Sequence, residues 1–180
     1  MTAFAAPDIS DVLIGSAITN ADLVRYAAKS DKIVLQHCDA GGQNCTQREV
    51  RKDEVEVVDG KVYVFNNGIF NVEDKALANG AKQSGDPANE KGVYHILNPY
   101  TGNPVAELMY AGYDKVNDWL GGILPVTQAS KTNQKIIEDA KQNGGVVDST
   151  NHSRGSMTWI NALGDLDRQG KEDMAVGGVY

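Results

Sequence analysis

The side chains with the clearest chemical potential stand in VVDSTNHSRGSMTW, which runs from Val146 to Trp159. A serine hydroxyl is a poor nucleophile unless a base takes its proton and a constrained turn presents its oxygen. In this stretch a β-branched run precedes Ser153 and a helical pattern follows it. The chemistry on offer is therefore nucleophilic attack from a strand-to-helix turn, and the alternative is an ordinary connection between a strand and a helix.

The five residues around Ser153 match most of a known nucleophile motif. α/β-Hydrolases carry their serine in G-x-S-x-G, where small residues flank a crowded turn. Gly155 fills the second small position, whereas Asn151 stands at the first, and Asn is among the few residues that tolerate positive φ. The motif predicts Ser153 as the catalytic nucleophile, with Asn151, His152 and Gly155 as supporting residues.

Such a nucleophile also needs hydrogen-bond donors for the oxyanion that develops on the substrate. The backbone N–H of the residue after the nucleophile, here Arg154, supplies one, and a loop after an earlier strand supplies another. VYVFNNGIFN contains a suitable loop, so we expect Gly68 and Ile69 to donate and Asn67 to support them. A glycine in such a loop also serves as a simple turn residue, and that alternative stays open.

The base is the missing part of this site. A triad in this fold runs Ser, then Asp or Glu, then His, but His37, His95 and His152 all precede Ser153. Either the chain is the first part of a longer hydrolase domain, or an upstream histidine serves, or the serine is not catalytic. His152 is a poor base because neighbouring side chains on such a turn diverge, and a lone strand histidine such as His95 is commonly structural. We expect the chain alone to be feebly active or inactive as a hydrolase.

Two cysteines give a second candidate feature. Cys38 and Cys45 enclose a short segment rich in Gly, Asn and Gln, which could close a small disulfide loop in an oxidising compartment. A zinc site at His37 and Cys38 is the alternative, but no second pair of ligands with finger-like spacing follows.

Other motifs point to no cofactor. The glycine pairs form neither G-x-G-x-x-G nor a P-loop. Asp114 and Asp118 are spaced i, i+4 and could hold a cation, but solvated carboxylates on a helix face are the favoured interpretation.

Hydrophobic periodicity indicates which elements must position these residues. Residues 1–50 read as a helical lead-in, with Asn20 as the N-cap of a helix from Ala21 to Lys29. Asp59-Gly60 then predicts a β-hairpin between EVEVV and KVYVF. Residues 51–180 continue as alternating strands and helices: a strand over 61–65, a helix starting close to Val72, a strand in GVYHILNP, helices in PVAELMYAGYDKVNDWLGG and ASKTNQKIIEDAKQ, a strand over 145–150, a helix over 155–167 and a strand in MAVGGVY. The first of the two consecutive helices has Leu108, Gly112 and Val116 at helical spacing and Gly121-Gly122 at its end. The helix over 155–167 has Met157, Ile160 and Leu163 on one face.

Strands that alternate with helices of this length predict a largely parallel sheet with crossover helices. The fold class is therefore α/β, preceded by the helical lead-in and the hairpin. Residues 51–180 are expected to form an α/β-hydrolase-like domain, truncated at its C-terminus if the base lies further along.

Charge and hydropathy exclude several classes of function. Seventeen Lys and Arg stand against 24 Asp and Glu, a net charge of −7, so no broad basic surface exists for nucleic acid. The N-terminus lacks a signal peptide, and no run approaches the ~20 apolar residues of a membrane span. With 41% hydrophobic and 23% charged residues, the chain is expected to fold as a globular protein.

Three stretches, VYVFNNGIFN, YAGYDKVNDWLGG and NHSRGSMT, resemble a region near the C-terminal ends of large filamentous-haemagglutinin-like exoproteins of Gram-negative bacteria, including contact-dependent growth inhibition effectors. The resemblance covers about Lys61 to Tyr180. It implies two-partner secretion to the cell surface, a toxic or processing role, delivery into a target cell in some systems, and a cognate immunity protein. The same region also resembles the central part of a lipase- or esterase-type α/β-hydrolase.

These observations leave three hypotheses. The first is a serine-hydrolase-like domain that acts on a small ester, thioester or lipid acyl group. The second is a non-catalytic toxin-associated module that binds an immunity protein or an entry receptor. The third is a nuclease toxin domain, which the acidic charge and the lack of a clustered set of His, Lys and Asp disfavour.

Overall fold

A six-stranded mixed sheet forms the centre of the part of the chain described by the computed structural model, which comprises residues 20–29, 31–69, 71–120, 124–171 and 173–180. Its strand order is β2-β1-β4-β3-β5-β6. Strands β4, β3, β5 and β6 are parallel, and β1 is antiparallel to both of its neighbours. The strands are β1 (Lys32–His37), β2 (Thr46–Val50), β3 (Lys61–Asn66), β4 (Val93–Leu97), β5 (Val146–Asn151) and β6 (Val176–Val179).

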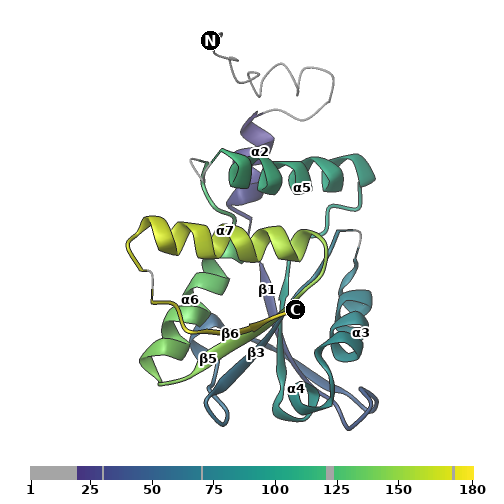
Figure 1. The fold of residues 1–180 in the computed structure, drawn as a ribbon. Coiled ribbons are helices and arrows are strands. Elements are labelled where there is room, and N and C mark those ends of the chain that lie inside the picture. Colours follow the sequence, from purple (N-terminus) through teal and green to yellow (C-terminus); the bar gives the residue numbers. More distant parts are fainter. Residues whose placement is uncertain (1–19, 30, 70, 121–123, 172) are drawn as a thin grey trace.

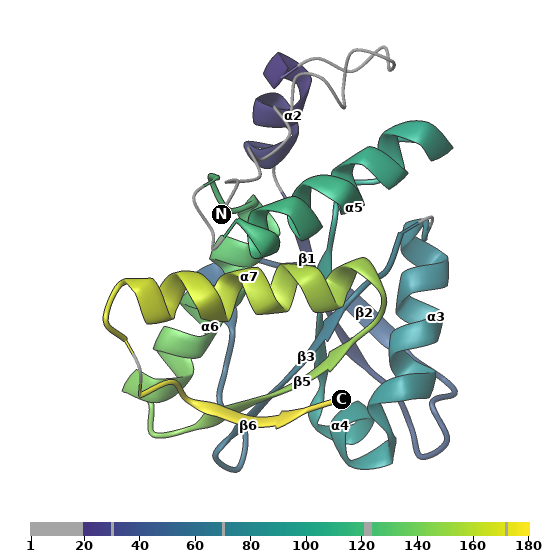
Figure 2. The same ribbon diagram turned by 45° about the horizontal axis from the view of Figure 1, so that its top comes forward.

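Helices cover both faces of this sheet (Figure 1). One face carries α3 and α4, and the other carries α6 and α7. Figure 2 shows α5 lying across α7 on the side away from the sheet, with α2 beside α5. The helices are α2 (Asn20–Ala27), α3 (Glu73–Ser84), α4 (Asp86–Lys91), α5 (Pro104–Trp119), α6 (Gln128–Gln142) and α7 (Arg154–Arg168), with a 3-10 turn, η1, at Lys52–Glu54.

Alternating side chains of the central strands fill two cores. Successive residues of a strand point to opposite faces, and strands covered on both faces are apolar throughout. Val64 and Ile96 therefore pack with Ile136 of α6 and Trp159 of α7. Residues of the opposite register pack beneath α3 and α4, namely Val34 and Leu97 with Ala76 and Leu77, and Phe65 and Val93 with Ala88. The α/β class and the crossover helices expected from the sequence are confirmed.

The helical expectation for the first fifty residues is wrong in part. A helix does begin at Asn20, but residues 32–37 and 46–50 are the strands β1 and β2 of the central sheet. The short apolar run of β1 fits a buried strand as well as a helix, and pairing with β4 decides between them. The helical segment expected before Asn20 lies outside the described residues.

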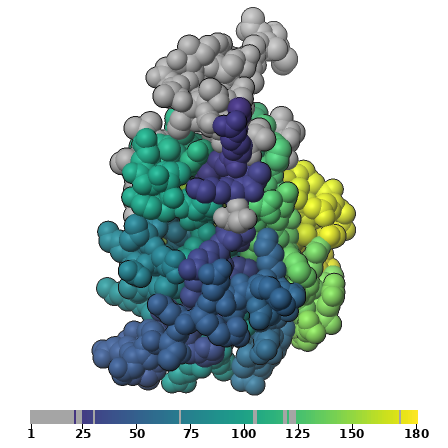
Figure 3. Space-filling view, turned by 180° about the vertical axis from the view of Figure 1, so that it is seen from behind, coloured from purple at the N-terminus to yellow at the C-terminus, as the bar shows by residue number. Residues whose placement is uncertain are grey.

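The antiparallel hairpin at the start of the sheet is formed by β1 and β2. Cys38 and Cys45 are joined by a disulfide in the loop that connects these strands. Figure 3 shows α2 and this hairpin on the surface of the molecule opposite to that in Figure 1. The disulfide, which the sequence left open against a zinc site, is the arrangement found in the structure.

The turn expected at Asp59-Gly60 forms without a full hairpin. Both residues have positive φ, 51° and 77°, as a two-residue turn requires. Its ladder is a single antiparallel bridge between Val58 and Lys61, so the strand expected before the turn is wrong. Val55 and Val57 instead pack against the core on the α6 and α7 side.

Glycines were expected to end α5 and α6. Gly144 follows α6 closely and has a φ of 70°. Gly121 and Gly122, expected to end α5, lie outside the described residues. Among the helices that the structure describes, none is long and apolar enough to cross a membrane.

Candidate active site

The carboxyl ends of β3 and β5 mark the point where the chain changes faces of the sheet. These strands are neighbours, with Asn66 opposite Asn151 at their ends. The helix after β3, α3, lies on one face, and the helix after β5, α7, lies on the other (Figure 1). In open α/β sheets such a reversal leaves a crevice outside the strand ends, where ligands generally bind.

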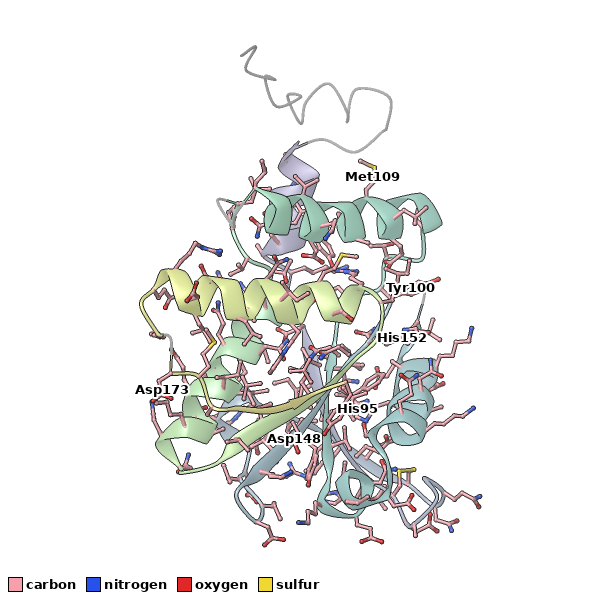
Figure 4. All side chains as sticks on the ribbon, viewed as in Figure 1. His95, Tyr100, Met109, Asp148, His152 and Asp173 are labelled. Atoms are coloured by element: carbon pink, nitrogen blue, oxygen red, sulfur yellow. A yellow bond between two sulfur atoms is a disulfide. The ribbon has the colours of Figure 1, made fainter. Side chains whose placement is uncertain are left out.

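Ser153 stands at these strand ends on a strained turn, residues 151–155, which we call the Ser153 turn. Its backbone has φ 54° and ψ −114°, a conformation that glycine adopts readily and other residues avoid. His152 N donates to Asn66 O at 3.1 Å and Gly155 N donates to His152 O at 2.9 Å, so backbone bonds fix the turn on both sides. Ser153 and His152 are exposed, and Figure 4 shows His152 where β5 leads into α7.

Two glycines allow the loop after β3 and the start of α7 to approach the Ser153 turn. A Cβ on Gly155 would collide with the backbone oxygen of Asn66. A Cβ on Gly68 would lie 2.5 Å from His152 Nδ1 and 3.1 Å from Ser153 Cβ. The sequence reasoning named Gly68, Asn67 and Ser153 as parts of one site, and the structure brings these segments into contact.

A buried amide network that the sequence reasoning missed lies directly beneath the turn. Asn66 Nδ2 donates to Asn151 Oδ1 at 2.8 Å, and Asn133 Nδ2 of α6 donates to Asn66 Oδ1 at 2.8 Å. Ser149 Oγ donates to the same Asn151 oxygen at 2.9 Å. Asn151, at the position where the motif has Gly, therefore ties the end of β5 to β3 and α6.

A second amide contact holds the loop after β3. Asn98, in the loop after β4, donates its backbone N–H to Asn67 Oδ1 at 2.8 Å. Asn67 is 2% exposed, so this bond is shielded from water. Asn67 therefore joins the loop that carries Gly68 to the loop after β4.

The side chain of Arg154 points away from Ser153 into the protein. It is 1% exposed and its Nε donates to Asp114 Oδ2 of α5 at 3.2 Å, while Nη1 lies 3.6 Å from Glu107 Oε2. Burial raises the pKa of Asp114 and lowers the pKa of Arg154, because a low-dielectric site disfavours either charge. Asp114 is not a solvated carboxylate of a helix face, and the side chain of Asp118 is outside the described set.

The first amides of α7 follow Ser153 directly. The initial N–H groups of a helix have no partner inside it. Gly155 N and Ser156 N donate to His152 O and Ser153 O, respectively, whereas the N–H of Arg154 makes no such turn bond to any residue that the structure describes. Together with the Gly68 and Ile69 amides of the facing loop, it could hold an anionic oxygen.

Comparison with protein-family models, with curated proteins and with solved structures gave no match to this chain.

Two of the three histidines lie where they cannot serve Ser153. His37 ends β1, which runs antiparallel to β4, and its imidazole lies against Gly92 at the amino end of β4. His95 is fully buried in β4 against Phe65 and Gly80, and burial lowers its pKa to about 3. Figure 4 shows His95 within the molecule, apart from the turn that carries His152.

Ser153 Oγ does not cap α7, and neither His37 nor His95 of the described residues lies at the Ser153 turn. The described residues hold no group of three or more His, Cys, Asp or Glu side chains that could bind a metal ion. What the site offers is an exposed hydroxyl on a strained backbone, next to the first amides of α7.

Proposed function

We propose that this chain contains a serine-hydrolase-like domain of the esterase or lipase type, with Ser153 as its nucleophile. The observation that carries the proposal is the backbone of Ser153, φ 54° and ψ −114°, at the junction of a buried strand and a helix. Strain of this kind costs on the order of 1–3 kcal/mol and gathers at functional sites. An ordinary connection between β5 and α7 would not require it.

The architecture supports an α/β-hydrolase-like reading of the fold. Ser153 follows a central parallel strand, the donor loop follows the neighbouring strand, and the two following helices lie on opposite faces. This is the context that a nucleophile motif of the G-x-S-x-G type requires. The close approach of Gly155 to Asn66 O accounts for the second small residue of the motif, and Gly68 lets the loop after β3 approach His152 and Ser153.

The acyl-transfer step uses Ser153 and three backbone donors. Ser153 Oγ attacks the carbonyl carbon of an ester, the N–H groups of Arg154, Gly68 and Ile69 hold the oxygen that becomes anionic, and the alcohol leaves with the serine proton. Water then cleaves the acyl-serine bond and releases the acid. Without a base that accepts the serine proton, the residual rate is several orders of magnitude below that of a complete triad.

The cellular setting is proposed from the resemblance to secreted haemagglutinin and contact-dependent inhibition proteins. In that setting the domain is part of a larger exported protein at the cell surface, is delivered into a target cell, and is held inactive by an immunity protein. The Cys38–Cys45 disulfide suits an oxidising compartment and supports export.

A non-catalytic module is the second candidate, favoured because neither His37 nor His95 of the described residues lies at the Ser153 turn. In that case the strained turn would shape a surface for an immunity protein or an entry receptor. The two candidates differ in one property, the reactivity of Ser153.

A fluorophosphonate probe measures that reactivity, because its phosphorus accepts the serine oxygen while fluoride leaves. Intact-mass analysis with peptide mapping would follow the wild type, Ser153→Ala and a neighbouring control, Ser156→Ala, with and without imidazole as an external base. We expect slow labelling of Ser153 that imidazole accelerates, in the wild type and in Ser156→Ala alike. Absence of any Ser153 adduct in imidazole would favour the module.

A further inference from the structure

The buried side chain of Arg154 has a geometry that reaches beyond its own helix. It lies where α7, α5 and α2 meet, immediately after the proposed nucleophile. Its backbone N–H follows Ser153 directly in the chain, while its guanidinium is enclosed among α5 side chains and the ring of Tyr26, 4.7 Å away. One residue thus connects the proposed oxyanion donor to the packing of two other helices.

The partners of Arg154 are themselves fixed. Glu107 Oε1 accepts hydrogen bonds from the backbone N–H and the hydroxyl of Thr101, both at 2.8 Å. Tyr26 stacks on Tyr110 of α5 at 3.6 Å between ring centres. The guanidinium is consequently held by the loop after β4 and by two helices.

This cluster has an unfavourable desolvation free energy. Burying a guanidinium with two carboxylates costs more desolvation than packing apolar side chains of the same volume. The cluster also leaves Arg154 Nη2 without a hydrogen-bond partner in the portion of the chain that the structure describes. Stability alone does not account for such an arrangement, whereas the need to fix one peptide group does.

We propose that Arg154 is a positioning residue: its guanidinium, gripped by Glu107 and Asp114, holds the Ser153–Arg154 peptide so that the Arg154 N–H points at the oxyanion. The inference rests on the proposed function of Ser153. The planar fork of an arginine fixes direction as well as charge, so lysine replaces it only in part. Loss of an oxyanion donor lowers a rate by about 100-fold to 1000-fold, and misdirection of one has a smaller effect in the same sense.

The test measures the inactivation of Ser153 by a fluorophosphonate at one fixed concentration of imidazole, resolved into the maximal rate constant and the probe concentration for half-maximal rate. The variants are Arg154→Met, Arg154→Lys and, as a control on the exposed end of the same helix, Arg168→Met. Each is assayed at a temperature where circular dichroism shows it fully folded. Glu107→Gln is added so that the test stands if Arg154→Met does not fold.

We expect Arg154→Met to lower the maximal rate constant at least about 10-fold with the half-saturating concentration changed less than about 2-fold. Arg154→Lys should recover part of the rate, Glu107→Gln should lose several-fold, and Arg168→Met should match the wild type. The positioning role is overturned if the wild type is labelled and Arg154→Met has the same maximal rate constant. If Arg154→Met does not fold, Glu107→Gln takes its place in this comparison. Either result leaves the proposed nucleophile unaffected. A wild type that is never labelled at Ser153 overturns the proposed function, and the positioning role with it.

Discussion

At the scale of single residues, the Ser153 turn concentrates unfavourable local geometry that the surrounding structure holds in place. Ser153 has a positive φ that glycine would adopt without strain. Gly155 and Gly68 lie where any side chain would strike a neighbouring segment. Strain and close contact at three nearby residues are what distinguish this turn from an ordinary connection.

Replacing Ser153 with glycine should stabilise the protein. The substitution removes strain of about 1–3 kcal/mol and adds an entropic cost of about 0.5–1 kcal/mol, so we expect a gain near 1 kcal/mol in the free energy of unfolding. Ser153→Ala keeps the strain and should stay within about 0.5 kcal/mol of the wild type. Urea unfolding of the three proteins checks this, and equal stability of the Gly and Ala variants would mean that the turn is not strained.

Adding a methyl group to Gly155 should be destabilising. Its Cβ would strike Asn66 O, a backbone atom that cannot move aside, and overpacking of this kind costs about 1–3 kcal/mol. Gly164 of the same helix is the matched control, because its Cβ would meet only the end of Arg168 at 3.4 Å. Gly164→Ala should be neutral or gain about 0.5–1 kcal/mol in urea unfolding, and a similar gain in Gly155→Ala would contradict the close approach.

Local sequence predicted the Ser153 turn, but not its support. The turn and the loop after β3 can be predicted from the sequence because Gly, Asn and Ser have restricted roles near strand ends. The amide network joins Asn66 to Asn133, which stands one turn before the buried Ile136 and Ile137 on the inward face of α6. An amide at helical spacing from apolar residues is a weak signal, since Ser130 and Thr132 of α6 are buried too, and the partner of Asn133 depends on the tertiary fold.

At the scale of elements, the sequence predicted the positions of α5, α6 and α7 better than it predicted which of their side chains are buried. Leu108 and Ile160, expected on apolar faces, are 58% and 50% exposed. The inward face of α7 holds Thr158, Trp159 and Ala162, and that of α5 holds Glu107 and Asp114. Polar side chains reach the interior there because Arg154 pairs with them, and no periodicity of apolar residues reveals a buried ion pair.

His95 of β4 is buried against Gly80 of α3, and this burial makes the free energy of unfolding depend on pH. Its folded-state pKa, about 3, lies below the ordinary value of 6.5, so the unfolded chain binds a proton first as the pH falls. The stability is complete above pH 6.5 and is lost progressively from there toward pH 3. Between pH 7.5 and 5 we expect His95 to account for a loss of about 2 kcal/mol.

Urea unfolding at pH 7.5 and pH 5 measures this effect in the wild type, His95→Leu and His152→Gln. The loss between the two pH values should be about 2 kcal/mol smaller in His95→Leu, whatever its absolute stability. His152→Gln, altered at an exposed position, should lose as much as the wild type. An identical loss in all three proteins would show that His95 is not held neutral by burial.

At the scale of the whole molecule, the β1–β2 hairpin extends the parallel part of the sheet and covers the side opposite to that shown in Figure 1. The Cys38–Cys45 disulfide closes its loop. Sequence patterns assigned this region to helices because a short apolar run has no period of its own, and only its pairing with β4 makes it a strand.

Breaking the disulfide should lower the stability of the whole fold. In the chain-entropy description, closing a loop of this length raises the free energy of the unfolded chain by about 2 kcal/mol, because it removes conformational entropy. A reductant should therefore lower the urea midpoint of the wild type toward that of the Cys38→Ala, Cys45→Ala double variant. The same reductant should leave the double variant unchanged, and an unchanged midpoint in the wild type would show that the bridge contributes nothing to stability.

The central claim is that Ser153 is a presented nucleophile which lacks only a base. The most direct measurement is the rate of Ser153 labelling by a fluorophosphonate as imidazole is raised at fixed pH and ionic strength. We expect a slow rate without imidazole, a rise in proportion to the concentration of its neutral form, and no adduct in Ser153→Ala. A Ser153 that stays unlabelled at every imidazole concentration would contradict the claim of a nucleophile, and rapid labelling without imidazole would contradict the claim that the base is missing.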